Sequence, residues 1–184
     1  MDLKKFDMST LNAPGVAVFI GPRAVGKTTA ITECLRHHDI PNGLKINKEY
    51  SKEAVQTFVE SQKISRTPAH LVLDACFYDS KWIKDPAIKS IFQNGRHYNI
   101  LTLIGMCYPM LPVNLRVSCD YVFISKTDSA NDRKNLYEHY GGNFHSLLHF
   151  EKTMDSLKQH EFLVLNNSPK TIEDIVSVYK TDLE

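Results

Sequence analysis

A glycine-rich segment near the start of the chain constrains the fold more than any other feature. Five apolar residues, Val16–Ile20, lead into GPRAVGKTT, which matches the pattern G-x-x-x-x-G-K-[ST]. After a buried strand and before a helix, this pattern predicts a P-loop, whose backbone N–H groups bind phosphate at a helix N-terminus. The predicted nucleotide-binding residues are Gly21, Pro22, Arg23, Ala24, Val25, Gly26, Lys27, Thr28 and Thr29.

Two side chains of this P-loop have predicted roles in the chemistry. Lys27 is expected to reach the β- and γ-phosphates, and the Thr28 hydroxyl is expected to bind Mg²⁺. ATP and Mg²⁺ are therefore the predicted cofactors. The alternative is a chance match in a glycine-containing turn, which the flanking strand and helix patterns disfavour.

Strand and helix patterns alternate along the rest of the chain. This alternation predicts an α/β fold of the P-loop NTPase type, a doubly wound and mostly parallel sheet flanked by helices, with the phosphate site at the carboxyl ends of the strands. The expected strands are Val16–Ile20, His70–Leu73, Asn99–Met106, Tyr121–Ile124 and Phe162–Leu165, with Leu44–Tyr50 ambiguous. The expected helices are Lys27–His38, Ser51–Gln62, Pro86–Asn94, Ala130–Tyr140, Phe144–Met154 and Ile172–Tyr179.

The chain length of 184 residues fits one domain. We expect residues 1–184 to form a single P-loop ATPase domain, with a polar lead-in over 1–14 and with helices and a late strand over 143–184. Phe6 and Met8 are expected to pack on this domain.

Composition bounds the class of protein and its surroundings. Hydrophobic residues make up 42% and charged residues 23%, which are values of a globular chain, and a net charge of +1 argues against a polycation. Basic residues outnumber acidic ones over 1–100 and the reverse holds over 151–184, so DNA would meet the first part. The scattered cysteines show no zinc spacing, and no apolar run spans a bilayer, which predicts a soluble intracellular protein in a reducing compartment.

A second carboxylate is needed at the tip of a neighbouring strand to hold Mg²⁺ through its water shell. Asp74 ends the apolar run Leu71–Leu73 and is therefore the predicted Walker B residue. The alternative is an ordinary turn-forming aspartate at a strand end.

Three segments resemble a known family. LVLDACFYDSKW, NGRHYNI and MCYPMLPVNLRVSCDYVFIS are similar to segments of the genome-packaging ATPases of large nucleocytoplasmic DNA viruses, within the FtsK/HerA superfamily. The similarity covers Val16 to Phe150 and is strongest from Leu71 to Ile124. It implies ATP hydrolysis in a homo-oligomeric ring, a pentamer or hexamer, that drives double-stranded DNA into a preformed capsid.

The resemblance also implies partners and a place. DNA would be bound through its phosphate backbone without sequence specificity, with Arg96, His97 and Lys81 as candidate contacts. A protein of the capsid vertex or of the internal membrane would be the docking partner. The expected location is the host cytoplasm or viral factory, at the packaging vertex.

The sequence departs from the family pattern at two positions that orient water at the γ-phosphate. Ala75 stands where members commonly have a polar or acidic residue, and Cys107 occupies the sensor position, where they commonly have Gln. Both departures affect hydrolysis more than nucleotide binding. Asp79 is the nearest carboxylate that could act as base, or else a solvated turn residue, and Glu33 is a weaker candidate.

An arginine supplied in cis or in trans can stabilise the transferring phosphoryl group. Arg116 and Arg96 are the candidates, and Arg116 is favoured as the trans finger. Alternatively, each arginine pairs with a nearby carboxylate such as Asp120 or contacts DNA phosphate.

Three other functions compete with the packaging motor. Ser125–Asp128 (SKTD) mimics the [NT]-K-x-D signature of GTPases, although no glycine follows Asp74 at the third position. A small metabolite kinase would need an arginine-rich lid, and no arginine cluster follows Lys134. With Ala75 and Cys107, the chain could instead bind nucleotide and hydrolyse it slowly or not at all.

Overall fold

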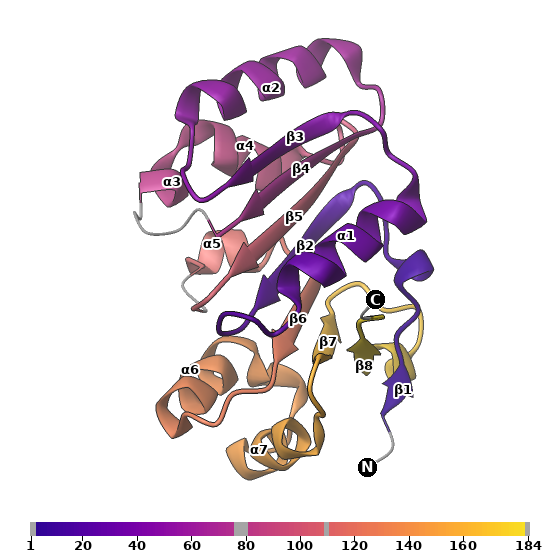
Figure 1. Cartoon of the computed structure of the whole chain (residues 1–184), viewed down its shortest axis with the longest axis vertical. Helices are drawn as coiled ribbons and strands as arrows, with labels where there is room; N and C mark the ends of the chain where they lie inside the picture. Colours follow the sequence, from indigo (N-terminus) through magenta and orange to yellow (C-terminus); the bar gives the residue numbers. More distant parts are fainter. Residues whose placement is uncertain (1–2, 76–80, 109–110, 183–184) are drawn as a thin grey trace.

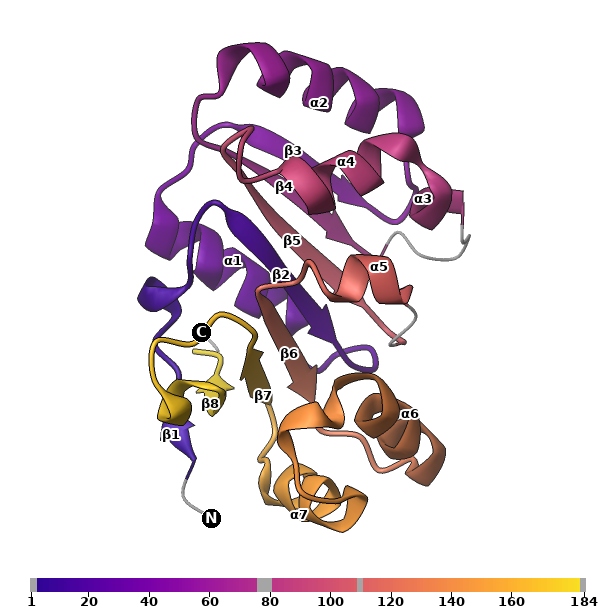
Figure 2. The same cartoon turned by 180° about the vertical axis from the view of Figure 1, so that it is seen from behind.

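The computed structural model describes residues 3–75, 81–108 and 111–182, and for Lys81 the backbone alone. Eight strands form one sheet with helices on both faces (Figures 1 and 2). The strands are β1 Lys4–Lys5, β2 Gly15–Ile20, β3 Gly43–Asn47, β4 Ala69–Asp74, β5 Ile100–Met106, β6 Tyr121–Ser125, β7 Glu161–Asn166 and β8 Val176–Lys180. The α-helices are α1 Lys27–His38, α2 Lys52–Ser65, α3 Lys81–Lys84, α4 Pro86–Asn94, α5 Val113–Arg116, α6 Ala130–Tyr140 and α7 Leu147–Ser156. Short 3₁₀ turns are η1 Met8–Thr10, η2 Gly141–Asn143 and η3 Ile172–Asp174.

The strand order is β1-β8-β7-β6-β2-β5-β4-β3. Neighbouring strands run parallel except that β7 is antiparallel to both β6 and β8. The predicted α/β class and mostly parallel sheet are thereby confirmed. Since β2 lies between β5 and β6, the loop that follows it emerges at the middle of the sheet's carboxyl edge.

The central strands are buried on both faces, which explains their continuous apolar sequences. Every residue of β2, β4, β5 and β6 is buried. One core cluster joins the sheet to α1 through Ala30, Ile31 and Cys34. The other joins it to the helices of the opposite face, with Val55 of α2 and Ile88 of α4 among its members.

Local signals set the helix boundaries. α1 begins after Gly26, whose left-handed φ of 95° is accessible to glycine, and it ends at His38, before the cap residue Asp39, which is also left-handed. The Ser51 side chain caps α2 by accepting from the Ala54 N–H, and Ser129 caps α6 in the same way. The segment Leu44–Tyr50, ambiguous in the sequence, contributes to strand β3, which spans Gly43–Asn47. Among the described residues, no helix is long and apolar enough to cross a membrane.

One expectation for the ends of the chain was wrong. The predicted helix Ile172–Tyr179 is the turn η3 followed by strand β8, so residues 143–182 contain one α-helix and two strands. The lead-in adds a short edge strand to the sheet, because β1 pairs with β8. Met8 is buried and Phe6 packs edge-on against Tyr121 and Phe123, which confirms that both residues pack on the fold.

Candidate nucleotide-binding site

The P-loop connects β2 to α1 and is held close to the ends of β5 and β6. The Gly21 N–H donates to the Met106 carbonyl at 3.1 Å. A Cβ on Gly21 would lie 1.9 Å from Ser125 Oγ, so the residue at this position must be glycine. Ala24 (φ 63°) and Gly26 (φ 95°) take left-handed backbone angles that curl the loop. Successive backbone amides can therefore face a bound anion.

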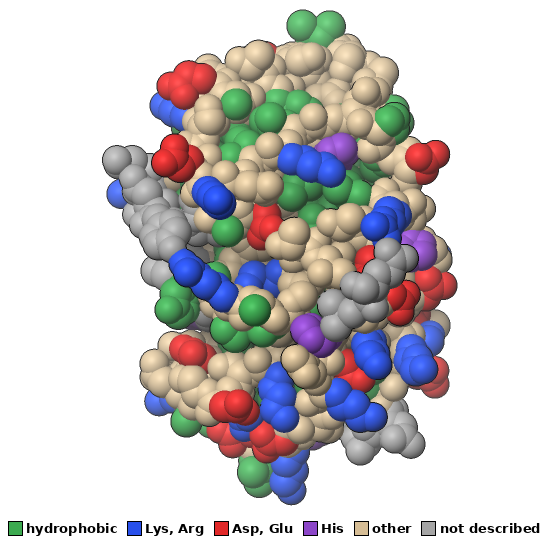
Figure 3. All heavy atoms as spheres, viewed as in Figure 1, with side chains coloured by type: hydrophobic (Ala, Val, Ile, Leu, Met, Phe, Trp, Pro, Cys, Tyr) green, Lys and Arg blue, Asp and Glu red, His purple; other side chains and the backbone are tan. Residues whose placement is uncertain are grey.

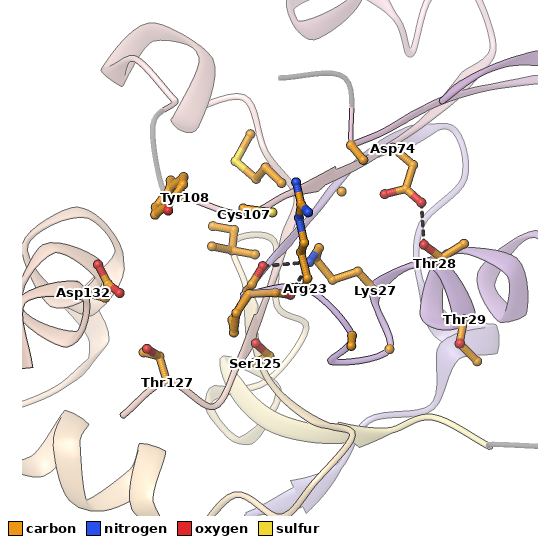
Figure 4. A pocket seen from close by; sticks show the side chains of 18 of the residues that line it. Arg23, Lys27, Thr28, Thr29, Asp74, Cys107, Tyr108, Ser125, Thr127 and Asp132 are labelled. Carbon is orange, nitrogen blue, oxygen red and sulfur yellow. Dashed lines mark hydrogen bonds between the residues drawn. The ribbon is translucent and has the colours of Figure 1, made fainter. Parts of the chain in front are cut away.

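Lys27 is folded over the loop that it ends. Its Nζ donates to the Gly21 carbonyl at 2.7 Å and to the Pro22 carbonyl at 2.6 Å. Burial lowers the pKa of Lys27, while Cys107 and Asp74 oppose this change. Arg23 extends into the cavity beside it (Figure 4). This end of the site is positively charged and suited to phosphate.

Thr28 at the start of α1 meets Asp74 at the end of β4, although β5 lies between β4 and the strand β2 that precedes the P-loop. Thr28 Oγ1 donates to Asp74 Oδ2 at 2.5 Å (Figure 4). Gly105 on the intervening β5 makes this contact sterically feasible, because a Cβ there would lie 2.5 Å from Asp74 Oδ1. A hydroxyl and a carboxylate side by side are hard oxygen donors of the kind that Mg²⁺ prefers. The pair therefore fits a magnesium ion.

A cavity of about 1240 Å³ opens above the P-loop. Thr28 and Asp74 lie at one end of it, and Thr127 and Asp132 lie at the other (Figure 4). Its lining includes Gly21, Pro22, Arg23, Ala24, Gly26, Lys27, Thr28, Thr29, Lys48, Asp74, Ala75, Gly105, Met106, Cys107, Ser125, Thr127, Asp132, Leu136 and His160. Of the predicted P-loop residues, Val25 instead packs against the α1-side core.

The two positions that depart from the family pattern both lie in the cavity. Ala75 follows Asp74 in a left-handed conformation (φ 56°), and Cys107 follows β5 with an intermediate exposure. Asp79 lies outside the described residues, as does the Lys81 side chain. Glu33 is buried and its carboxylate accepts the hydroxyl of Tyr179 on β8.

The two candidate arginines lie elsewhere in the chain's own fold. Arg96 pairs with Asp120, whose other oxygen accepts the Val16 N–H at 2.8 Å, so this ion pair sits where β2 begins. His97 is exposed next to it. Arg116 is on α5, with its guanidinium carbon 5.8 Å from the ring centre of Tyr140. Of the two arginines, Arg96 thus forms the ion pair with Asp120 that was predicted from the sequence as an alternative, and no such pair is seen for Arg116 among the described residues.

The SKTD segment divides between cavity and surface. Ser125 and Thr127 line the cavity. Lys126 donates to the Asp155 carbonyl on α7 at 3.3 Å, and Asp128 is exposed and 3.6 Å from Arg133 on α6. The two side chains on which guanine recognition would depend are therefore engaged with helices α6 and α7.

Sequence reasoning missed several cavity residues, among them Lys48, Gly105 and His160. Lys48 follows β3, and its N–H donates to the Asp74 carbonyl at 3.2 Å. Gly105 is hidden in an apolar strand, where nothing in the pattern marks it. His160 precedes β7, and because β7 is antiparallel its amino end reaches the same edge as the P-loop. A uniformly parallel sheet would have put His160 at the opposite edge.

Two sequence relatives of this chain are proteins of large DNA viruses. No protein-family model matches the chain. It is 27% identical over 203 residues to an uncharacterized protein of Acanthamoeba polyphaga mimivirus, covering 90% of this chain and 72% of that protein. An uncharacterized protein of Invertebrate iridescent virus 6 is 34% identical over 113 residues, covering 58% and 44% respectively. The chain thus spans less than half of the iridescent-virus relative.

Solved structures share the fold. The genome packaging NTPase B204 from Sulfolobus turreted icosahedral virus 2, in complex with ATP-gammaS, has a TM-score of 0.66 at 15% identity, covering 94% of this chain and all of that one. The cytoplasmic domain of the Thermomonospora curvata Type VII Secretion ATPase EccC has a TM-score of 0.57 at 11% identity, covering 92% and 25%. The resemblance to viral packaging and FtsK-type ATPases is therefore confirmed at the level of the fold.

Proposed function

We propose that this chain is an ATPase subunit that moves double-stranded DNA into a preformed viral capsid. The observation that carries the proposal is the convergence of Lys27, Thr28 and Asp74 at one end of a large cavity. The fold shared with a viral genome packaging NTPase and an ATPase of type VII secretion supports it. Residues 1–184 act in this proposal as a single P-loop ATPase domain in the host cytoplasm or viral factory, at the packaging vertex.

Each group at the phosphate end of the cavity has a proposed role in binding the nucleotide. Thr28 and Asp74 would hold Mg²⁺, which when bound neutralises charge on the β- and γ-phosphates. When nucleotide binds, Lys27 Nζ would leave the two loop carbonyls and donate to phosphate oxygens instead. The phosphate oxygens are the stronger acceptors because they are charged. The P-loop amides orient the phosphate chain, and Arg23 adds positive charge. Together these groups bind a nucleoside triphosphate and polarise its γ-phosphate.

ATP is the proposed substrate in preference to GTP. A guanine site of the SKTD type needs the Asp128 carboxylate to face the base. In this fold Asp128 is exposed and next to Arg133, and Lys126 contacts α7. We therefore expect GTP to compete poorly with ATP for binding.

Hydrolysis is proposed to be slow unless a further group activates water. The Ala75 methyl cannot accept a proton, and it occupies the position next to Asp74 within the cavity. Asp79 remains the candidate base, and Asp79→Asn should slow turnover while leaving ATP binding intact. The second candidate function, a subunit that binds ATP as an assembly signal, is favoured by Ala75 and Cys107.

The decisive measurement is phosphate release from assembled protein with and without double-stranded DNA. Stimulation by DNA, abolished in Lys27→Ala and Asp74→Ala, is the expected result, with a loss of about 100-fold or more for each variant. Asp128→Ala, on an exposed carboxylate, is the matched control and should release phosphate normally. Nucleotide binding without any phosphate release would favour the assembly-signal function.

DNA binding is proposed to rest on phosphate contacts summed over a ring. On the face seen in Figure 3, basic and acidic side chains are interspersed, which suits weak contact by each subunit. Affinity should fall steeply with salt and should not depend on sequence. Arg96 and His97, both exposed, are proposed contacts, together with Lys81.

Arg116 is proposed to act on the nucleotide of a neighbouring subunit. If it does, mixing Arg116→Ala with wild type should lower the ring's ATPase activity more than in proportion to the mutant fraction. A strictly proportional loss would mean that each subunit's site is complete on its own. Lys134→Ala, which removes an exposed positive charge from α6, serves as the control.

A further inference from the structure

The cavity is larger than its phosphate end requires. Ligand pockets commonly measure about 300–1,000 Å³, and this one measures about 1240 Å³. Lys27, Thr28 and Asp74 define where the β- and γ-phosphates lie. A nucleotide bound there must direct its nucleoside away from Asp74, toward the end formed by β6, α6 and the residues before β7.

Ser125 contributes an unusual hydroxyl to that end. It closes β6 beside Gly21 and is only 3% exposed. Within the described part of the chain, its Oγ has no hydrogen-bond partner. An unsatisfied buried hydroxyl costs stability, and a polar group of a ligand can offset that cost.

His160 approaches the same end from the next strand. Its Nδ1 is buried and, among the residues that are placed, finds no hydrogen-bond partner. That nitrogen lies 3.4 Å from where a Cβ on Gly26 would be, so the ring rests against the P-loop. The backbone of His160 is left-handed (φ 62°), which a residue with a side chain adopts at a cost. The imidazole thus lies against the P-loop, and its backbone takes a locally unfavourable conformation there.

The chemistry of this end suits a nucleoside and not a phosphate. Asp132 adds a carboxylate that repels phosphate, and Leu136 adds apolar surface. Lys126, the residue after Ser125, donates its ammonium group to the Asp155 carbonyl on α7. A hydroxyl, an imidazole, a carboxylate and an apolar side chain match the donors, acceptors and flat faces of ribose and a purine.

We infer that Ser125 and His160 form a nucleoside subsite that contacts the ribose and base of the nucleotide bound by the P-loop. The inference rests on the proposed function, because the phosphates must occupy the P-loop for the nucleoside to reach this subsite. It adds two specificity-determining residues, one from β6 and one from the turn before the antiparallel β7.

The test compares two ligands by calorimetry, ADP and inorganic tripolyphosphate, both with Mg²⁺. Ser125→Ala and His160→Asn are the variants, since asparagine tolerates a left-handed backbone. Each should weaken ADP binding by about threefold to tenfold, the equivalent of one lost hydrogen bond, and leave tripolyphosphate binding unchanged. The matched controls are Ser177→Ala, a buried serine on β8 whose Oγ also has no partner among the described residues, and His145→Ala, an exposed histidine. Both should bind ADP like wild type.

Other outcomes overturn the inference in distinguishable ways. Equal loss of ADP and tripolyphosphate affinity would show that the two residues act through the P-loop, and unchanged ADP affinity would show that they do not contact the nucleotide. If wild type binds inorganic pyrophosphate, which carries the same two phosphates, as well as it binds ADP, the phosphate site stands and the nucleoside subsite does not. If wild type binds neither ligand, the proposed function itself fails.

Discussion

Gly105 shows how a residue without a side chain can determine the geometry of the proposed Mg²⁺ site. It lies on β5 between β2, which leads into the P-loop, and β4, which ends at Asp74, and a Cβ there would lie 2.5 Å from Asp74 Oδ1 and 3.2 Å from Ile31 Cδ1. The Asp74 carboxylate therefore occupies space that any other residue would fill. The Thr28–Asp74 contact depends on this glycine as much as on the two residues that make it.

Gly105→Ala should displace the Asp74 carboxylate from Thr28. We expect the Mg²⁺ concentration needed for half-maximal nucleotide binding to rise by about 10- to 100-fold, as for changes around other metal ligands. Gly142→Ala is the control, since an added Cβ there meets no atom of the described structure within 4 Å. Unchanged Mg²⁺ dependence in Gly105→Ala would contradict the assignment of Asp74 to the metal.

Asp120 organises the opposite edge of the sheet. It is buried, with one oxygen accepting the Val16 N–H at 2.8 Å and the other paired with Arg96. Asp120→Ala should lower the free energy of unfolding by about 1–3 kcal/mol, because it leaves the Val16 N–H buried without a partner. Urea unfolding measures this loss. Asp128→Ala, on an exposed carboxylate, should change stability by no more than about 0.5 kcal/mol.

At the scale of elements, the sequence predicts the strands that carry the site and misreads the margins of the sheet. The P-loop between β2 and α1, and Asp74 at the end of β4, follow from patterns that a buried parallel strand and a phosphate loop impose. β8 was expected to be a helix because its apolar residues also fit helical spacing. Pairing with β7 and β1 decides in favour of a strand, and that pairing depends on residues far away in sequence.

The same dependence explains which site residues the sequence did not reveal. Gly105 matters only because Asp74 and Thr28 flank it in space. His160 reaches the cavity only because β7 reverses direction. Both facts belong to the packing of strands and not to any local pattern, so single-sequence reasoning had no signal for them.

A buried contact ties β8 to the helix that follows the P-loop. The Tyr179 hydroxyl donates to Glu33 Oε2, and both residues are buried. Burial and the neighbouring Glu33 carboxylate raise the pKa of Tyr179, so the phenol stays protonated and able to donate. This contact holds the carboxyl-terminal hairpin against α1.

Tyr179→Phe should destabilise the fold by about 1–3 kcal/mol, because the Glu33 carboxylate stays buried without its donor. The double variant Tyr179→Phe with Glu33→Met should cost less than Tyr179→Phe alone, since it removes the buried charge together with its partner. Thermal and urea unfolding of the three proteins form the test. A double variant less stable than Tyr179→Phe would contradict this expectation, because it would show that Glu33 stabilises the fold even without the Tyr179 hydroxyl.

At the scale of the whole molecule, three histidines make stability depend on pH. Burial lowers the pKa of His38, His70 and His139 below the ordinary value of 6.5. Their neutral forms are favoured in the folded state, so near and below this pH the unfolded chain binds more protons than the folded one. The stabilisation is present above the ordinary value and is lost as pH falls through the lowered folded-state values.

Unfolding free energy should therefore decline between about pH 7 and about pH 5. His70→Asn should flatten this decline, because His70 lies on β4 with its Nδ1 3.0 Å from the Ile40 carbonyl, a bond that an asparagine amide can also donate. His145→Asn, on an exposed imidazole, is the control. An identical pH slope in wild type and His70→Asn would rule out a contribution from His70.

The position of β2 has a consequence for the order in which this protein matures. Its two partners in the sheet, β5 and β6, lie about 80 and 100 residues later in the chain. A ribosome delivers the P-loop early, but the strand before it has no partner until residue 106 has emerged and lacks its second partner until residue 125 has, and His160 follows later still. A nascent chain can therefore expose the whole P-loop long before the sheet that positions it has formed. If the chain binds nucleotide as proposed, that binding reports that β5 and β6 have paired with β2.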